Sequence, residues 1–299
     1  MTSWRSRAMP ALLRLTGRHR PYASADAARA HMQQRAAHPQ PFGPPPRLRP
    51  KVTITLQHGS SWPTYTLTPP ASTPELTVIY LHGGGWVNEI TSRHWQLAAQ
   101  IAHQARATVI VPIYPLLPSA TAADVVPAVV EMATQHADVY LAGDSAGGQI
   151  ALSATLLLRD EHGVVLPGTV LISPALDLSL SNPAIASVEP TDPWLGRDAV
   201  QFFADRWRGD LPVDDPRVSP LAADLTGLGP LTVFSGTRDI LNPDARLLAE
   251  KAAAAGVAIE YYEEPGLLHV FPLTPTPEGR AARRIIVERI GGGTESTRR

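Results

Sequence analysis

From about residue 76 onward, apolar residues form continuous runs that alternate with stretches of helical periodicity. The apolar runs are LTVIYLHGG, ATVIVPIYP, ADVYLAGD and GTVLISPALDL, and after an interruption the alternation resumes with GPLTVFSGTR and VAIEYYEE. Helical stretches separate these runs, and a last helix is predicted from about Glu278 to Ile290. Continuous apolar strands with helices between them are typical of a parallel sheet covered on both faces. The pattern therefore predicts an α/β fold with a mostly parallel central sheet.

Three other regions depart from this alternation. Residues 1–45 contain one or two short helices and a proline-rich extended linker, after which KVTITLQ and TYTLTP alternate as antiparallel edge strands do. Between about residues 180 and 215 the sequence predicts a helical insertion above the sheet, and the glycine-rich tail 291–299 is predicted to be disordered. We therefore expect a main domain over 46–290, with residues 1–45 and the insertion forming a small helical cap.

Composition and charge exclude several classes of protein. The chain has 299 residues with 44% hydrophobic and 18% charged content and a formal net charge of −1, so neither nucleic acid nor an anionic membrane is favoured as a partner. The absence of cysteine excludes disulfides, thiolate metal sites and a cysteine nucleophile. No apolar run reaches the roughly 18 residues of a membrane span, and Pro10 and Arg14 interrupt the N-terminal apolar stretch. We expect a soluble, cytoplasmic protein.

One serine stands where a predicted strand meets a predicted helix. Gly143-Asp144-Ser145-Ala146-Gly147 fits G-x-S-x-G, in which a sharp, strained turn lifts the serine oxygen above the sheet. The neighbours of such a turn must be small because adjacent elements approach closely. A tight turn in which Ser145 merely caps the helix would have the same local sequence. The motif alone therefore leaves both interpretations open.

A second glycine-rich segment supports the catalytic interpretation of this serine. His82-Gly83-Gly84-Gly85-Trp86 also follows a buried strand. A reaction that forms a tetrahedral oxyanion needs backbone N–H groups about 3 Å from that oxygen, and consecutive glycines can supply them without interfering side chains. Neither G-x-G-x-x-G nor a lysine-containing phosphate loop is present, so a phosphate-binding loop is disfavoured.

A serine nucleophile requires a histidine base and an acid, which follow it in the order serine, acid, histidine in this kind of sheet. Of the two later histidines, His269 comes just after the last predicted strand, whereas His162 lies at a helix end. Asp239 ends a buried strand and is the preferred acid, with Asp177 as the runner-up. Asp244 is expected in the first turn of the following helix.

In combination these motifs resemble the hormone-sensitive-lipase-like branch of the α/β-hydrolase esterases. The resemblance rests on HGGGW, GDSAGG, SGTRDIL and GLLHVF and extends from about residue 76 to 290. It implies that Ser145, Asp239 and His269 are the nucleophile, acid and base of a catalytic triad. It also implies that the oxyanion hole consists of the N–H groups of Gly84, Gly85 and Ala146. His82 is then a structural residue that supports the glycine loop. The segments YPLLPSA and DILNPD depart from the family's usual Y-R-L-A-P-E and D-x-L-x-D-E, so the contacts of the family's arginine and glutamate are absent here.

The resemblance implies hydrolysis of a small-molecule ester through an acyl-enzyme, with no metal and no organic cofactor. Short-to-medium acyl chains are favoured by the small cap, and a homodimer is left open. Candidate pocket residues are aromatic, namely Trp86, Trp194, Phe202 and Phe203, although helical spacing makes most cap aromatics packing residues. A lactone, amide or formamide hydrolase could use the same triad, and a non-catalytic binding protein of this fold is a further alternative.

Overall fold

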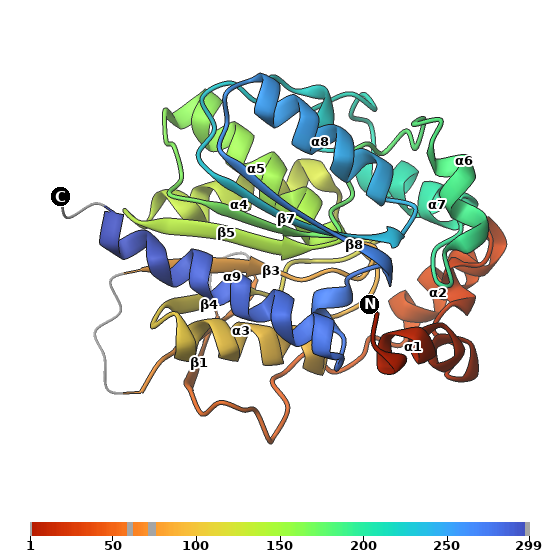
Figure 1. Cartoon of the computed structure of the whole chain (residues 1–299), viewed down its shortest axis with the longest axis horizontal. Helices are drawn as coiled ribbons and strands as arrows, with labels where there is room; N and C mark the ends of the chain where they lie inside the picture. The colour runs from red at the N-terminus through yellow and green to blue at the C-terminus, as the bar shows by residue number, and fades with distance from the viewer. Residues whose placement is uncertain (1, 59–61, 71–75, 297–299) are drawn as a thin grey trace.

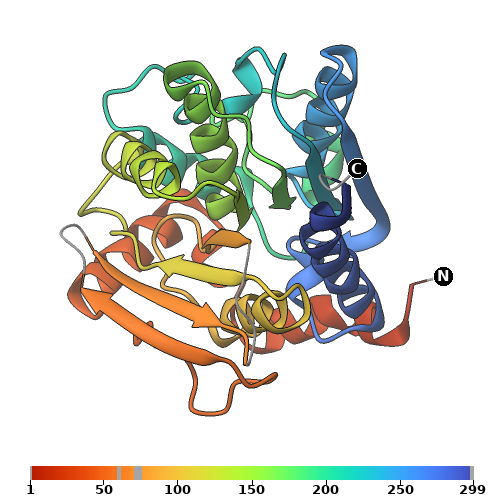
Figure 2. The ribbon, with the colours of Figure 1, turned by 90° about the vertical axis from the view of Figure 1, so that its left-hand side faces the viewer.

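The computed structural model describes residues 2–58, 62–70 and 76–296, with side chains described up to residue 292. Among these residues eight strands form one sheet in the order β1-β2-β4-β3-β5-β6-β7-β8. The pairs β1–β2 and β2–β4 are antiparallel, and all other neighbours are parallel. Figure 2 shows the antiparallel pair at one edge of the sheet. The strands are β1 (Thr53–His58), β2 (Pro63–Thr68), β3 (Thr77–Leu81), β4 (Thr108–Pro112), β5 (Val139–Asp144), β6 (Thr169–Ile172), β7 (Leu231–Arg238) and β8 (Ile259–Leu268).

Helices cover both faces of this sheet and gather at the end where the parallel strands finish (Figure 1). In Figure 1, α4, α5 and α8 lie on one face, α3 and α9 on the other, and α1, α2, α6 and α7 beside the strand ends. Their bounds are α1 (Trp4–Leu15), α2 (Ala25–Ala37), α3 (Ser92–Gln104), α4 (Ala122–Thr134), α5 (Ala146–His162), α6 (Ile185–Val188), α7 (Arg197–Arg208), α8 (Asn242–Ala254) and α9 (Pro277–Ser296). The predicted α/β architecture is confirmed.

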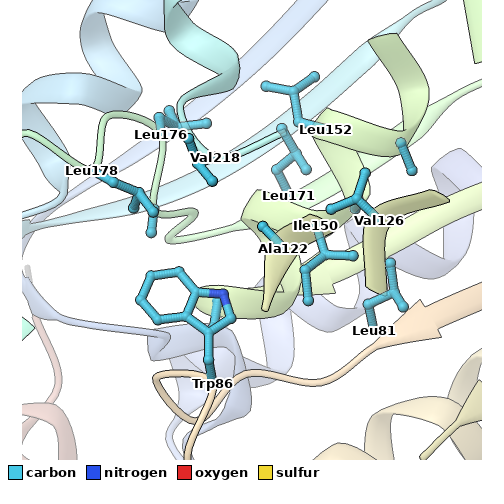
Figure 3. Close-up of a cluster of buried hydrophobic side chains, with 14 of the residues drawn as sticks. Leu81, Trp86, Ala122, Val126, Ile150, Leu152, Leu171, Leu176, Leu178 and Val218 are labelled. Carbon is cyan, nitrogen blue, oxygen red and sulfur yellow. The ribbon is translucent and has the colours of Figure 1, made fainter. Parts of the chain in front are cut away.

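Alternation along the central strands divides the core into two apolar clusters. In β3, Ile79 and Leu81 belong to the cluster that packs on α4 and α5, whereas Val78 and Tyr80 belong to the one that packs on α3 and α9. Figure 3 shows Leu81 in the first cluster with side chains of α4 and α5. Because both faces are buried, the strands are apolar at nearly every position, which explains the continuous runs in the sequence.

The N-terminal segment docks on elements from the far end of the chain. The Ser3 backbone N–H and the Ser3 and Ser6 hydroxyls all donate to the Glu278 carboxylate at the start of α9. Helix α2 packs against α7, the main helix of the insertion, and Gly196 N–H donates to the Tyr22 carbonyl at 2.9 Å. Residues 1–45 and the insertion are therefore neighbours in space, at the carboxyl ends of the strands.

The last helix is longer than the sequence analysis predicts. Helix α9 continues from the expected end at Ile290 to Ser296, so most of the tail expected to be disordered is helical; residues 297–299 lie outside the described residues. A glycine costs about 1 kcal/mol relative to alanine in a helix, but it keeps its backbone hydrogen bonds, so an established helix can continue through it. Over the described ranges, no helix combines the length and apolarity that crossing a membrane requires.

Candidate active site

A strained turn carries Ser145 between β5 and α5. Ser145 has φ 53° and ψ −117°, a backbone conformation that L-residues rarely adopt. The flanking glycines are required by close backbone approaches. A Cβ on Gly147 would lie 2.0 Å from the Leu81 carbonyl oxygen, and one on Gly143 would lie 2.3 Å from the Gly147 carbonyl oxygen. The turn can therefore form only with glycine at these two positions.

The structure brings Ser145, His269 and Asp239 into one hydrogen-bonded row. His269 Nε2 lies 2.9 Å from Ser145 Oγ, and His269 Nδ1 lies 2.8 Å from Asp239 Oδ2. Asp239 and His269 directly follow β7 and β8, two neighbouring parallel strands, so both side chains emerge at the same end of the sheet as Ser145. Asp239 is fully buried and also accepts the Leu241 N–H, which fixes its carboxylate.

The electrostatic surroundings of His269 favour its protonated form. Burial by itself lowers the pKa of this imidazole, but the charge and hydrogen bond of Asp239, with smaller contributions from Asp192 and Asp144, raise it above its ordinary value. A base with a raised pKa accepts a proton more readily once it is neutral. The row is therefore suited to taking a proton from the Ser145 hydroxyl.

The loop after β3 has an unusual backbone conformation and lines the same cavity as the serine. After β3, Gly84, Gly85 and Trp86 all have positive φ, at 131°, 63° and 57°. The Gly83 N–H donates to Asp144 at 3.0 Å, whereas in the described part of the chain the N–H groups of Gly84, Gly85 and Ala146 form no hydrogen bond. Ala146 is the first residue of α5, where backbone N–H groups have no intrahelical acceptor. Gly84 and Gly85 line the same cavity as Ser145.

Asp144, directly before the serine, connects the two glycine segments. Its buried carboxylate accepts the Tyr80 hydroxyl at 2.6 Å and the Gly83 N–H, and His94 Nε2 lies 3.3 Å away. Burial alone raises the pKa of Asp144, but His94 and these donors lower it below its usual value, so the group is ionised. His82 is buried and stacked on a tyrosine ring, with its Nδ1 2.8 Å from the Gly83 carbonyl. His82 thus contacts the loop that the resemblance predicts it to support.

Side chains of the N-terminal segment hold the outer part of the loop through Asn88. Asn88 Nδ2 donates to the Gly84 carbonyl and to the Tyr22 hydroxyl, both at 2.9 Å, and Asn88 Oδ1 lies 2.7 Å from His31 Nε2. The Tyr22 hydroxyl also lies against Gly85, where an added Cβ would be 3.1 Å away. Burial raises the pKa of Tyr22 to about 12, so it stays protonated. The sequence analysis missed Asn88, Tyr22 and His31.

The carboxylate of Asp192, from the insertion, forms a hydrogen bond with the backbone directly after Asp239. Asp192 Oδ2 accepts the Ile240 N–H at 2.9 Å, adjacent to Asp239, and Oδ1 accepts the Trp194 and Leu195 N–H groups. The Trp194 ring in turn meets His269 edge-on, with centroids 5.8 Å apart. Burial and the charge of Asp239 raise the pKa of Asp192 to about 6. Asp192 therefore couples the insertion to the row of proposed catalytic groups.

The cavity that contains Ser145 and His269 has a volume of about 550 Å³. Of the aromatic residues expected to line it, Trp86, Trp194 and Phe203 do so. Most of Trp86 is nevertheless buried in the core, where it stacks on another tryptophan (Figure 3 labels Trp86). Phe202 is not among the lining residues, because neighbours on a helix point about 100° apart. Its ring instead lies under the Arg206 guanidinium, 3.4 Å away.

The other candidates for the acid and the base form no hydrogen bond with Ser145 or His269 within the described residues. Asp177 accepts from Ser179 and Ser181 in a local turn, Asp244 lies in the first turn of α8 as expected, and His162 ends α5. Over the described ranges, no group of three or more His, Asp or Glu side chains is arranged to hold a metal ion.

Comparisons with known proteins find relatives among esterases and lipases. Residues 78–273 match a family described as alpha/beta hydrolase fold. A triacylglycerol lipase of Mycobacterium tuberculosis is 34% identical over 205 residues, which are 66% of this chain and 42% of the lipase. An esterase of Acinetobacter venetianus is 30% identical over 205 residues, 65% of this chain and 68% of that esterase. The match thus covers less than half of the lipase.

Solved structures resemble almost the whole chain. A putative esterase from Staphylococcus aureus superposes with a TM-score of 0.84 at 25% identity, covering 91% of this chain and 94% of that one. An esterase of the bacterial hormone-sensitive lipase family gives a TM-score of 0.81 at 26% identity, covering 98% and 99%. The chain belongs to the α/β-hydrolase fold family, and its resemblance to the hormone-sensitive-lipase-like branch is confirmed.

Proposed function

We propose that this protein is a serine carboxylesterase that hydrolyses small esters with short-to-medium acyl chains. The observation that carries the proposal is the continuous row of hydrogen-bonding contacts from Ser145 through His269 to Asp239, 2.9 and 2.8 Å long. A nucleophile, a base and a buried acid in this order are the parts that acyl transfer requires. The relatives and structures whose names include esterase and lipase add support.

In the proposed acylation step, His269 Nε2 takes the Ser145 proton while the serine oxygen attacks the ester carbonyl carbon. Asp239 holds the imidazole in the tautomer with its proton on Nδ1 and stabilises the imidazolium that forms. The N–H groups of Gly84, Gly85 and Ala146 would receive the oxyanion, since they form no other hydrogen bond within the described residues. The tetrahedral intermediate then collapses, and His269 protonates the departing alkoxide.

In the proposed deacylation step, water takes the place of the alcohol. His269 removes a proton from this water as it attacks the acyl carbon, and the Ser145 oxygen leaves with that proton, which releases the carboxylic acid. Removing one oxyanion donor from such a site costs roughly 10² to 10³ in rate. A cavity of about 550 Å³ is within the usual range for small-molecule sites, which supports small substrates.

We further infer that residues 46–290 carry this chemistry, with residues 1–45 and the insertion at about 180–215 covering the site. A cytoplasmic location and a homodimer remain predictions.

A p-nitrophenyl ester chain-length series, with fluorophosphonate labelling, tests the function. The proposal expects turnover that is highest for short or medium acyl chains, and a covalent label that Ser145→Ala removes. Ser145→Ala and His269→Ala should each lower kcat by about 10⁴-fold or more. Correctly folded protein that neither turns over esters nor takes the label would contradict the proposal and favour a binding role. Faster turnover of matched lactones or anilides would instead favour a lactone or amide hydrolase.

A further inference from the structure

The charges that line the active-site cavity do not balance. Arg18, Arg35 and Arg93 contribute three guanidinium groups, and Glu89 and Asp144 contribute two carboxylates. Both carboxylates already have partners: Glu89 pairs with Arg35 and accepts the Gln40 N–H, and the Asp144 contacts are described above. Two arginines, Arg18 and Arg93, therefore remain without a carboxylate partner in the cavity.

Among the described residues, no carboxylate lies within ion-pair distance of either arginine. Arg93, half-buried at the start of α3, donates from Nη1 to the Leu273 carbonyl at 3.2 Å, which uses one of its five N–H donors. Arg18 is exposed just beyond α1. Burial, and then the like charge of Arg18, lower the pKa of Arg93, while Arg93 itself helps to lower the pKa of Arg283. Positive charge therefore gathers at this end of the cavity.

Two further donors in the cavity lining are buried without an acceptor among the described residues. Trp194 Nε1 and Arg35 Nε are shielded from water and form no hydrogen bond with that part of the chain, and both residues line the cavity. The Trp194 ring also contacts the His269 ring, so this residue belongs to the part of the cavity that contains the proposed base. Buried donors without partners are rare in native structures, because they lose their hydrogen bonds to water without replacement. A ligand rich in acceptor oxygens would satisfy them.

We propose that the substrate is an ester that also carries a carboxylate, which binds at the Arg18–Arg93 end of the cavity. This inference rests on the proposed esterase function and narrows its substrate class. Arginine is well suited to the role, because its planar fork can bind a carboxylate with two parallel hydrogen bonds. In this arrangement the scissile ester carbonyl faces the glycine loop, and the carboxylate of the substrate extends toward α1 and α3.

The test compares matched anionic and neutral esters. One pair is the mono-p-nitrophenyl ester of glutaric acid against p-nitrophenyl pentanoate, which places the carboxylate on the acyl side. The other is 4-acetoxybenzoate against its methyl ester, which places it on the leaving-group side. The ratio of kcat/KM, anionic over neutral and corrected for spontaneous hydrolysis, is measured for the native protein, Arg93→Gln, Arg18→Gln, Arg93→Lys and the control Arg284→Gln. Arg284 is exposed on α9 and does not line the cavity.

For at least one pair, the ratio should fall about two- to fivefold in Arg93→Gln and in Arg18→Gln, the size expected for partly exposed ion pairs. Arg93→Lys should keep most of the ratio, Arg284→Gln should leave it unchanged, and neutral-ester kcat/KM should stay within about twofold throughout. High salt should reduce the native ratio, because it screens the arginine charges.

An unchanged ratio in both glutamine variants, or an equal fall in Arg284→Gln, would overturn the inference. If neutral esters are hydrolysed but the anionic-over-neutral ratio does not fall in the glutamine variants, this inference is wrong and the esterase proposal is unaffected. Absence of all turnover together with absence of fluorophosphonate labelling would instead remove the proposed function itself. Arg18→Gln alters an exposed side chain, so it keeps the test decisive if Arg93→Gln fails to fold.

Discussion

The two glycine-containing segments that meet at the active site are held in different ways. At the turn around Ser145, main chain packs on main chain: the Gly147 position faces the Leu81 carbonyl so closely that no side chain fits. In the loop after β3, side chains from distant segments hold the backbone, with Asn88 joining Gly84 to Tyr22 and His31. The first arrangement depends on residue size alone, and the second on a network of partners.

This difference determines how each segment should respond to mutation. A main-chain contact cannot adjust locally, because a strand and a helix would have to move apart to accommodate one extra carbon atom. A side-chain network can lose one member and keep the others, so its failure should be graded. We therefore expect large, all-or-none effects at the turn and intermediate effects in the loop.

The largest effect is expected from Gly147→Ala. Its Cβ would overlap the Leu81 carbonyl oxygen, so we expect a loss of about 3 kcal/mol or more in the free energy of unfolding and a fall of at least about 100-fold in kcat. Urea unfolding and p-nitrophenyl acetate hydrolysis measure the two. Gly43→Ala is the control, since its Cβ would meet only the Tyr65 hydroxyl at an ordinary 3.6 Å. Near-native activity of Gly147→Ala would show that the turn has more room than these distances allow.

An intermediate effect is expected from Asn88→Ala. Without the bonds from Asn88 the Gly84 carbonyl and the Tyr22 hydroxyl lose their shared donor, and the N–H groups proposed to bind the oxyanion are held less firmly. We expect kcat to fall by about 10- to 100-fold with little change in KM or Tm. Tyr22→Phe removes only one partner and should cost less. A pure KM effect, or equal losses in both variants, would break the distinction between the loop and the turn.

A smaller effect, best seen as pH dependence, is expected from Asp192→Asn. In the proposed mechanism His269 acts as a base only when neutral, so kcat/KM should rise with pH through a midpoint above the ordinary histidine value, because the pKa of His269 is raised. Asp192 contributes to that increase through its negative charge, so its removal should move the midpoint to lower pH. Since the pKa of Asp192 is about 6, this carboxylate loses its charge below that pH in the native protein. The activities of the native protein and of Asp192→Asn should therefore differ mainly above pH 6.

Asp198→Asn, at an exposed position on α7, is the matched control for this experiment and should leave the midpoint in place. A midpoint that stays put, or rises, in Asp192→Asn would contradict the electrostatic role.

No effect on activity is expected from Asp244→Asn, because Asp244 lies outside both glycine-containing segments. Asp244 is 1% exposed, and its Oδ2 has no hydrogen-bond partner among the described residues. Burial, with the charge of Asp177, raises its pKa to about 6. The folded state therefore binds this proton more tightly than the unfolded chain, and stability is lost as pH rises from about 4 to 6. Asp244→Asn should be more stable than the native protein by about 1–3 kcal/mol at pH 7 and equally stable near pH 4.

Urea unfolding at the two pH values measures the difference, with exposed Asp210→Asn as the control. Equal stabilisation at both pH values would point to a cause other than ionisation.

The features that could be predicted from the sequence are those encoded locally. Continuous apolar runs marked the parallel strands, and chain order marked Ser145, Asp239 and His269 as partners. Each rests on periodicity or on a conformation that few residue types allow. The structure agrees at all of these positions.

The missed features depend on contacts between segments far apart in sequence. Asn88 and Asp192 look like ordinary polar residues, and only the docking of the N-terminal segment and the insertion gives them these partners. Orientation within a helix was also beyond reach at Phe202, because adjacent apolar residues both fit a buried face. The extension of α9 through Gly291 was missed since glycine signals a helix end more often than a continuation.

The backbone conformation of Ser145 has a consequence for how this protein can change over evolutionary time. A non-glycine residue at φ 53° and ψ −117° costs on the order of 1–3 kcal/mol, which glycine would largely recover. Glycine would be favoured at this position if stability alone mattered. With serine here the chain gives up part of its thermodynamic margin, so any gain in stability must come from substitutions elsewhere.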